Sequence, residues 1–327
     1  NVNAFDRLGA VCNKLGNYEE ALVHLNHATG LDKRSSTAYP EKVITLIYLE
    51  KYDQALRASD TAIIIKDNPL NYYWRGITYS RLNNDVSAKK EFEKAIAKDK
   101  KAVEPRLALA ELLLKGGDNQ GAMAQCNEIL KNDDRNTQAY LMRSKVYKAN
   151  IDFPNAINDI SKNILIEPSN PDFYLIRGKY YQEFNQHTNG INDFTKYITL
   201  NAGNPDAYFA RAKSYQEIMN YEKAMEDYTK ITELSEFNQE ARKMLKDAQA
   251  QLYELNRENV APEITVINPA PVSETVEIRG DNNTVLISGK IKDKSKIKSL
   301  SINNEVVIPS LKNGEYEFFA NINVNGI

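Results

Sequence analysis

The feature that most constrains this chain is an internal repeat with a period of about 34 residues. Segments that begin at Tyr140, Tyr174 and Tyr208 align without a gap, and Tyr72 begins a fourth segment two periods before Tyr140. A period of this length indicates small helical units that stack and together bury one continuous core. Numbered from 1 to 34, seven repeats cover residues 2–238, and the second is one residue short. They start at Val2, Ser36, Pro69, Val103, Thr137, Pro171 and Pro205.

Each repeat has the residue pattern of two antiparallel helices. Large side chains at positions 4 and 11 share one helix face, and position 8 between them is mostly small. Position 20 is alanine in six repeats and Gly190 in the sixth. Small residues on facing helices allow a close approach, so we expect two helices per repeat. The turns are expected near residues 16–18, 50–52, 83–85, 116–119, 150–153, 185–188 and 219–221.

These position classes resemble the tetratricopeptide repeat, and the resemblance covers residues 2–238. The shared pattern is an aromatic residue at 4, a small residue at 8, Tyr at 11, Ala at 20, an aromatic residue at 24 and Ala at 27. The resemblance implies a right-handed superhelix, an α-solenoid whose first helices line a concave groove. Two departures stand out: position 32 is proline only at Pro168, and position 4 of the fourth repeat is Arg106.

After the repeats, the pattern changes twice. Residues 239–257 keep helical apolar spacing and are predicted to cap the array, which makes fifteen helices over residues 1–257. Residues 258–262 form a linker. From Glu263 the period is two, with about six short strands predicted at 264–267, 275–280, 283–293, 297–304, 305–309 and 314–324. Residues 263–327 resemble the small Ig-like modules of bacterial envelope and multidomain proteins. A complete Ig domain has roughly 100 residues, so we expect an incomplete β-sandwich without its last strand.

Composition excludes several classes of function. A formal net charge of −2 gives no global attraction for nucleic acid or an anionic membrane, and no apolar run is long enough to span a bilayer. His24 and His27 share a helix face, but no cysteine or acidic partner has ligand spacing, so no metal site is expected. Cys12 and Cys126 occupy packing positions and are interpreted as small buried core residues without a chemical role. We expect no cofactor, no catalytic residue and no enzymatic activity in this chain.

Two repeat positions vary together. Position 7 is arginine in four repeats, and position 23 is acidic in the same four. Such matched variation indicates contact, and a half-buried guanidinium needs an acidic partner on the facing helix. We interpret the pairs as structural and not as a binding site. They are Arg75 with Glu91, Arg143 with Asp159, Arg177 with Asp193, and Arg211 with Asp227.

The implied groove is the predicted binding surface. The family's concave positions include 2, 5, 9 and 12. In the second and third repeats they supply an apolar stretch with Ile44, Ile47, Tyr73 and Ile77. Later repeats supply a lysine row suited to an acidic peptide, which consists of Lys145, Lys148, Lys179 and Lys213. The alternative is internal neutralisation, because Glu183 and Glu217 lie one helical turn after the last two lysines.

These observations favour a non-enzymatic scaffold that binds a protein or peptide partner in its groove. One alternative is the regulatory part of a larger protein whose catalytic domain, for example a caspase-like peptidase, lies beyond residue 327. Another is a cell-envelope assembly factor. The Asn-, Lys- and Tyr-rich composition and the Ig-like module lean toward a bacterial envelope or periplasmic protein of the Bacteroidetes type rather than a cytoplasmic one. The sequence does not name the partner or the oligomeric state.

Overall fold

The computed structural model describes residues 2–234, 238–258, 263–268, 284–292, 300–302, 305–312 and 315–323. The chain forms two compact units, Asn1–Ala210 and Arg211–Ile327. The described residues contain fifteen helices, as the repeat pattern predicts, and every turn between paired helices falls at its expected place.

The first helix of each repeat carries an odd number. These helices are α1 (Val2–Leu15), α3 (Ala38–Tyr48), α5 (Pro69–Arg81), α7 (Val103–Lys115), α9 (Thr137–Ala149), α11 (Pro171–Glu183) and α13 (Pro205–Glu217). The second helices are α2 (Tyr18–Leu31), α4 (Tyr52–Ile65), α6 (Asp85–Lys98), α8 (Asn119–Asn132), α10 (Phe153–Ile166), α12 (His187–Leu200) and α14 (Tyr221–Leu234). The helix α15 (Gln239–Glu258) packs on α14, as a cap does.

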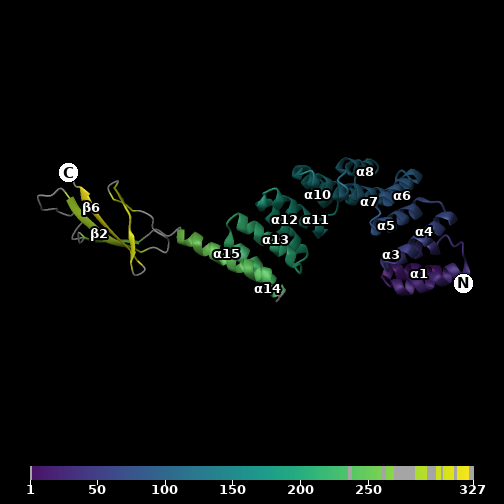
Figure 1. The fold of residues 1–327 in the computed structure, drawn as a ribbon, viewed down its shortest axis with the longest axis horizontal. Helices are drawn as coiled ribbons and strands as arrows, with labels where there is room; N and C mark the ends of the chain where they lie inside the picture. Colours follow the sequence, from purple (N-terminus) through teal and green to yellow (C-terminus); the bar gives the residue numbers. More distant parts are fainter. Residues whose placement is uncertain are drawn as a thin grey trace. The chain divides into compact units, whose positions relative to one another are not determined.

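Within the first unit, neighbouring repeats contact each other along a solenoid. Each odd-numbered helix packs on the even-numbered helix that follows it and on the one that precedes it. Odd-numbered helices of successive repeats also touch, from α1 with α3 to α7 with α9 (Figure 1). The odd-numbered helices from α1 to α9 therefore form a continuous layer, and their faces are where a shared groove would lie.

Close packing inside a repeat depends on the small residues. A methyl group at Gly76 would lie 2.5 Å from the ring of Phe92, and one at Gly178 would lie 2.6 Å from the ring of Phe194. A methyl group at Gly190 would lie 3.1 Å from the backbone oxygen of Gly178. Position 8 thus makes room for the large residue at position 24, and position 20 lies against the backbone of the facing helix. The sequence predicted close approach at 8 and 20 but not the role of 24.

Every turn inside a repeat uses a left-handed residue at position 15. Two of the seven are glycine, Gly16 and Gly117. The others have φ between 56° and 60°, and they are Glu50, Asn83, Ile151, Asn185 and Met219. This conformation is costly for most side chains and most of all for a β-branched one such as Ile151.

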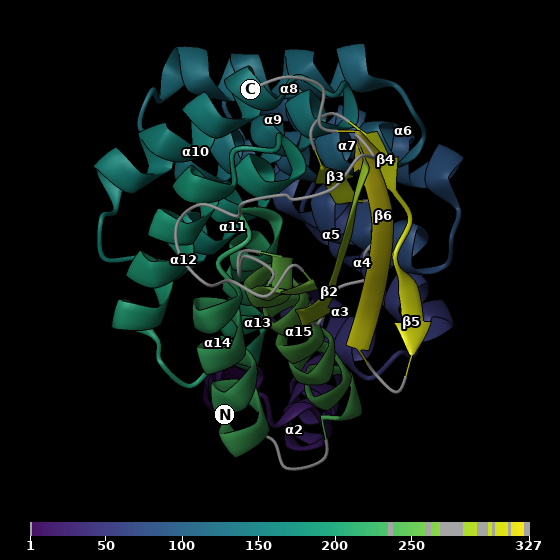
Figure 2. The same cartoon turned by 90° about the vertical axis from the view of Figure 1, so that its left-hand side faces the viewer.

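The described C-terminal strands form a four-stranded antiparallel sheet in the order β1-β2-β6-β5, together with a separate pair, β3 with β4. Figure 2 shows β6 between β2 and β5. The bounds are β1 (Glu263–Asn268), β2 (Thr284–Lys292), β3 (Leu300–Ile302), β4 (Glu305–Val307), β5 (Ser310–Lys312) and β6 (Glu315–Asn323).

The alternation expected along β6 is present in its described side chains. Phe318 and Ala320 are buried, whereas Phe319 between them is 63% exposed. Phe318 lies opposite Gly289 of β2, whose missing side chain leaves room for the ring. The predicted strand at 275–280 lies outside the described residues. The Ig-like identity and the incompleteness of this module stay predictions.

Candidate functional site

A cavity of about 570 Å³ lies on the first unit where α1, α3 and α5 meet. Six of its lining residues occupy repeat positions 2, 5 and 9, for which the tetratricopeptide resemblance implies the concave face. They are Asn3, Asp6, Ala10, Thr37, Pro40 and Leu70. Successive odd-numbered helices therefore present these positions to one shared surface, which we call the inner face.

The buried carboxylate of Asp6 is the most distinctive group of this cavity. Asp6 is only 8% exposed, and its Oδ2 accepts hydrogen bonds from Thr37 Oγ1 at 2.6 Å and Ser35 Oγ at 3.1 Å. Its Oδ1 is buried and has no hydrogen-bond partner among the described residues. Such an oxygen is costly unless something donates to it, and the described part of the protein supplies no donor.

The cavity wall holds three further charged residues. Glu41 is held by Asn13, whose Nδ2 donates to its Oε2 at 2.8 Å and to its backbone oxygen at 3.1 Å. Arg7 and Lys66 also line the cavity, and neither has an ion-pair partner in the part of the chain that the structure describes. The wall thus offers a hydrogen-bond acceptor and two cationic groups, which together match the mixed polarity of a peptide backbone.

The apolar half of the predicted groove is largely covered by neighbouring repeats. Ile47 is 6% exposed and belongs to a core cluster against which Trp74 and Ile77 pack. The expectation that Ile47 offers contact area is therefore wrong, because the next repeat buries it. Ile44 and Ile77 are half-buried.

Tyr73 is also half-buried, and its ring packs on Trp74 and Phe92, with ring centroids 5.0 and 6.2 Å away. Burial, with smaller effects from Glu104 and Glu111, raises the pKa of its hydroxyl. Tyr73 also packs against a core cluster that includes Leu109 and Leu112 of the fourth repeat, so it takes part in the packing between repeats.

The four lysines of the predicted row differ in whether they form ion pairs. Lys145 and Lys179 are exposed, and no ion pair involves either within the described residues. Lys148 Nζ lies 2.6 Å from Glu183 Oε1 on the next repeat and 5.6 Å from the ring centroid of Tyr180. Glu183 therefore neutralises Lys148 of the preceding repeat. The pairing with Lys179 that the i,i+4 spacing predicted is absent from the described residues. Lys213 is exposed and belongs to the second unit.

All four expected arginine–acid contacts are present. Arg177 Nε and Nη2 donate to the two oxygens of Asp193 at 2.8 and 2.7 Å, which raises the pKa of Arg177. The same bidentate pair of hydrogen bonds joins Arg143 to Asp159 and Arg211 to Asp227. Arg75 instead donates twice to one oxygen of Glu91. The acids are almost fully buried. We call this contact between positions 7 and 23 the arginine clamp.

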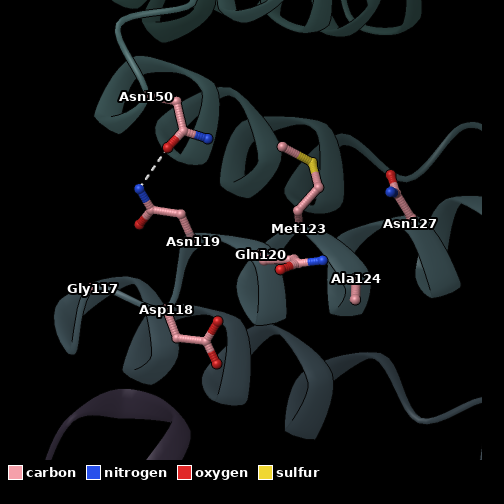
Figure 3. A pocket seen from close by; sticks show the side chains of 8 residues that line it. All are labelled: Gly117, Asp118, Asn119, Gln120, Met123, Ala124, Asn127 and Asn150. Carbon is pink, nitrogen blue, oxygen red and sulfur yellow. Dashed lines mark hydrogen bonds between the residues drawn. The ribbon is translucent and has the colours of Figure 1, made fainter.

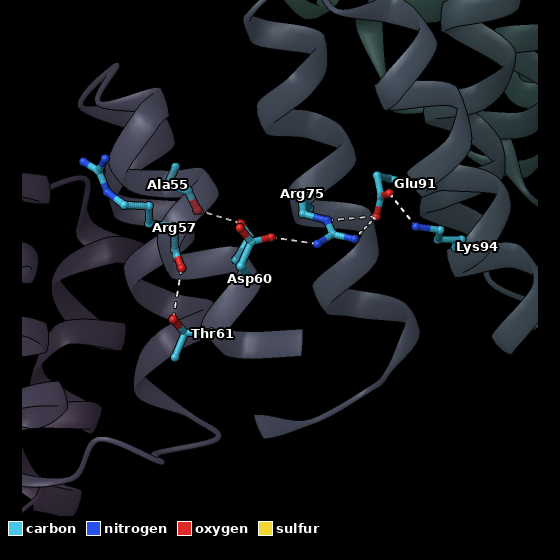
Figure 4. A network of polar contacts seen from close by, with 8 residues as sticks. Ala55, Arg57, Asp60, Thr61, Arg75, Glu91 and Lys94 are labelled. Carbon is cyan, nitrogen blue, oxygen red and sulfur yellow. Dashed lines mark hydrogen bonds and ion pairs between the residues drawn. The ribbon is translucent and has the colours of Figure 1, made fainter. Parts of the chain in front are cut away.

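The clamp also reaches the preceding repeat, which the sequence did not predict. Arg75 Nη1 donates to Asp60 at 2.8 Å, as Figure 4 shows, and Asp60 is at position 25 of the second repeat. Arg143 donates to Asn127 and Arg177 to Ser161, both again at position 25. One guanidinium therefore joins three helices from two repeats.

The repeats without the clamp use other chemistry. In the fourth, Leu109 is buried at position 7, and Arg106 donates from position 4 to Gln125 Oε1 at 2.7 Å and to the backbone oxygen of Lys100. In the second, Lys42 donates to Thr29 at 3.3 Å, and burial lowers the pKa of Lys42.

In the first repeat, atoms of Cys12, Glu20 and His24 that can ligate a metal lie within 4.8 Å of one another, a grouping that the sequence did not predict. Glu20 and His24 are four residues apart on one face of α2. The packing of α1 on α2 brings Cys12 to them. The expectation of no metal site stays a prediction. Burial, together with the nearby Glu20 carboxylate, raises the pKa of the Cys12 thiol.

A second and larger cavity, of about 730 Å³, lies beside the start of α8 and the end of α9. Asn119 Nδ2 donates to Asn150 Oδ1 at 2.6 Å across it (Figure 3). Its one charged wall residue, Asp118, accepts the backbone N–H of Gly121 and so caps α8. Its polar groups are already engaged in structural roles, and the cavity by α1 is the better candidate.

Family models described as tetratricopeptide repeat match residues 86–146 and, separately, residues 2–35 and 205–238. The last two matches coincide with the first and seventh repeats as numbered above. No curated protein is significantly similar in sequence. No described helix is both long and apolar enough to cross a membrane.

Several solved structures share the fold. A tetratricopeptide repeat protein from Parabacteroides merdae is 15% identical, with 76% of this chain and 98% of that chain covered and a TM-score of 0.54. The C-terminal part of a repeat-containing protein from Cytophaga hutchinsonii is 17% identical, with 73% and 98% covered and a TM-score of 0.58. A chain of the APC/C hetero-tetramer Cut9–Hcn1 is 14% identical, with 76% and 49% covered and a TM-score of 0.55. At these identities the likeness concerns the fold alone.

Proposed function

Because the chain is built largely of tetratricopeptide repeats, we propose that it is a non-catalytic scaffold that binds an extended peptide segment of a partner protein on its inner face. The observation that carries the proposal is the cavity by α1, α3 and α5. It has about 570 Å³ of space, within the usual range for ligand pockets, and Asp6, Arg7 and Lys66 are among the residues that line it. Solenoids commonly use such extended concave surfaces for binding.

The chemistry of the wall suits a polypeptide. Arg7 and Lys66 line the cavity and would donate to carbonyl or carboxylate oxygens of the ligand. Leu70 is 52% exposed at the edge of the cavity and offers apolar contact area. Farther along the inner face, Lys145 and Lys179 would attract acidic residues of the same ligand, an effect that salt weakens.

The test is selection of peptides from a random displayed library on the full chain, followed by affinity measurement with two matched variants. Leu70→Arg changes the cavity edge, and Val86→Arg changes α6, where Val86 is 83% exposed and lies outside the cavity. The selected peptides should bind Leu70→Arg at least about tenfold more weakly and Val86→Arg unchanged. Tyr73→Ala is a poorer reporter, because Tyr73 also packs between repeats.

Equal binding to the wild type and to Leu70→Arg would reject the cavity as the site. The double change Lys145→Glu/Lys179→Glu separates the two parts of the inner face. It should weaken acidic peptides at low ionic strength and have little effect at high ionic strength. The regulatory and envelope alternatives stay predictions, and no contact described above favours either.

A further inference from the structure

Three side chains with different metal-ligand atoms meet between the first two helices. Cys12 lies near the end of α1, and Glu20 and His24 lie one turn apart on α2. A thiol sulfur, a carboxylate oxygen and an imidazole nitrogen all lie within 4.8 Å of one another. His24 Nε2 and Glu20 Oε1 are 3.8 Å apart. Ligand atoms around one zinc ion are about 3–4 Å apart, as follows from bond lengths of about 2.0–2.3 Å.

The set of atoms fits one class of cation. Sulfur, nitrogen and oxygen ligands together suit zinc and similar divalent transition ions, whereas calcium and magnesium prefer oxygen alone. Three protein ligands leave one tetrahedral position for water. The site has a route to solvent, because the side chain of Glu20 is 61% exposed, while Cys12 is 7% exposed and forms the floor.

The histidine offers one of its two nitrogens to the ion. His24 Nε2 lies 3.8 Å from Glu20 Oε1 and is the nitrogen next to the other ligand atoms, whereas Nδ1 is buried elsewhere in the packing. The ring also stacks near Phe5, with centroids 6.1 Å apart, which holds the imidazole in place.

The other repeats show why this site is confined to the first. Four repeats hold an arginine at position 7, whose positive charge next to position 23 would repel a cation. The first repeat has Leu8 there and combines cysteine at position 11 with histidine at position 23, a combination that none of the other six repeats has. We propose that Cys12, Glu20 and His24 bind a divalent transition ion of the zinc class, with water as the fourth ligand.

The test uses Co²⁺ and Zn²⁺ alone as probes of the full chain. Addition of Co²⁺ should produce a thiolate-to-cobalt absorption band in the near ultraviolet that saturates at one equivalent and disappears on addition of Zn²⁺. Cys12→Ser should abolish the band. His24→Gln and Glu20→Gln should each weaken Co²⁺ binding at least about tenfold. Because Glu20 is largely exposed, Glu20→Gln keeps the test valid even where Cys12→Ser fails to fold.

The chain offers matched controls for each ligand type. Cys126→Ser removes the other cysteine, which is buried in the fourth repeat, and His27→Gln removes an exposed histidine one turn from His24. Both controls should bind Co²⁺ as the wild type does. No thiolate band in the wild type, a band that survives Cys12→Ser, or equal loss in Cys126→Ser would overturn the proposal.

Discussion

Repeats three, five, six and seven differ from repeats one, two and four at the same two positions. In the first group, an arginine at position 7 is clamped by a buried acid at position 23. In the second group, positions 7 and 23 hold Leu8 and His24, Lys42 and Ala58, and Leu109 and Gln125. Both groups form the same helix pair, so the fold does not depend on the arginine–acid pair.

The difference also shows that the two positions change together. No repeat keeps a buried acid at position 23 without its arginine. A buried charge that has lost its partner is strongly destabilising, whereas an apolar or neutral pair at the same place is tolerated. The clamp is therefore a coupled unit within the repeat. Three changes test this comparison, and a fourth extends it to the turns.

The largest effect is expected for Arg177→Leu. The change leaves the carboxylate of Asp193, whose side chain is 7% exposed, without its cation. It should lower the free energy of unfolding by about 3–5 kcal/mol, as measured by urea denaturation. Arg177→Leu/Asp193→Leu, which imitates the second group of repeats, should be much less damaging than the single change. A double variant as unstable as the single one would contradict the coupling.

A smaller loss is expected for Arg106→Leu in the fourth repeat. This arginine donates to the neutral amide of Gln125 and to a backbone oxygen, so its removal strands no charge. We expect a cost of about 1–2 kcal/mol in the same denaturation experiment. A loss equal to that of Arg177→Leu would show that the guanidinium matters for its packing and not for the charge that it pairs with.

The fold could be read from the sequence because its signal is repeated seven times. The turns, the fifteen helices of the described chain and the four clamps all follow from position classes that recur from one repeat to the next. A contact that occurs in only one repeat is harder to predict from the sequence. Arg106 sits one helical turn before position 7, on the same face, and reaches the residue at position 23 from there. A search for an arginine one helical turn away from position 7 would have found Arg106.

The candidate site was predicted less well, because it depends on contacts between repeats. Ile47 has an inner-face position, but Trp74 and Ile77 of the next repeat cover it. Glu20 and His24 have the i,i+4 spacing of one helix face, which the sequence shows, whereas Cys12 joins them only through the packing of α1 on α2. The positions of the cavity wall were predicted through the family resemblance, whereas the unpaired oxygen of Asp6 required the structure.

The turns give a third prediction, which compares the fourth and fifth repeats. Position 15 is Gly117 in the fourth and Ile151 in the fifth, with φ of 82° and 60°. Ile151 is 79% exposed, so its side chain contributes little packing. Ile151→Gly should raise the free energy of unfolding by about 1 kcal/mol through relief of the left-handed conformation. The control is Asn185→Gly, where asparagine already tolerates this conformation and little change is expected.

The smallest effect concerns Lys42, which has no acidic partner at position 23. Burial lowers its pKa from the ordinary 10.5, so the folded state holds the proton less tightly than the unfolded state. The penalty is complete below the folded pKa and disappears as the pH rises from there toward 10.5. Lys42→Met should therefore stabilise the chain at pH 7 by roughly 0.5 kcal/mol, and the gain should shrink in alkaline solution. The exposed Lys145→Met should show no such trend with pH.

The bond from the clamp arginine to position 25 of the preceding repeat affects how the solenoid unfolds. Arg75, Arg143 and Arg177 each donate a hydrogen bond to position 25 of the preceding repeat, so a half-buried cation joins the repeats at three borders. The borders before the second and fourth repeats have no arginine at position 7 to make this bond. In a linear array, each unit opens at the cost of its own stability and of its bonds to its neighbours. Unfolding would then proceed in blocks, repeats two and three together and repeats four to six together, if this bond outweighs the Lys42–Thr29 and Arg106–Lys100 bonds at the other two borders. The sequence would thus fix where transient breaks occur in an otherwise uniform stack.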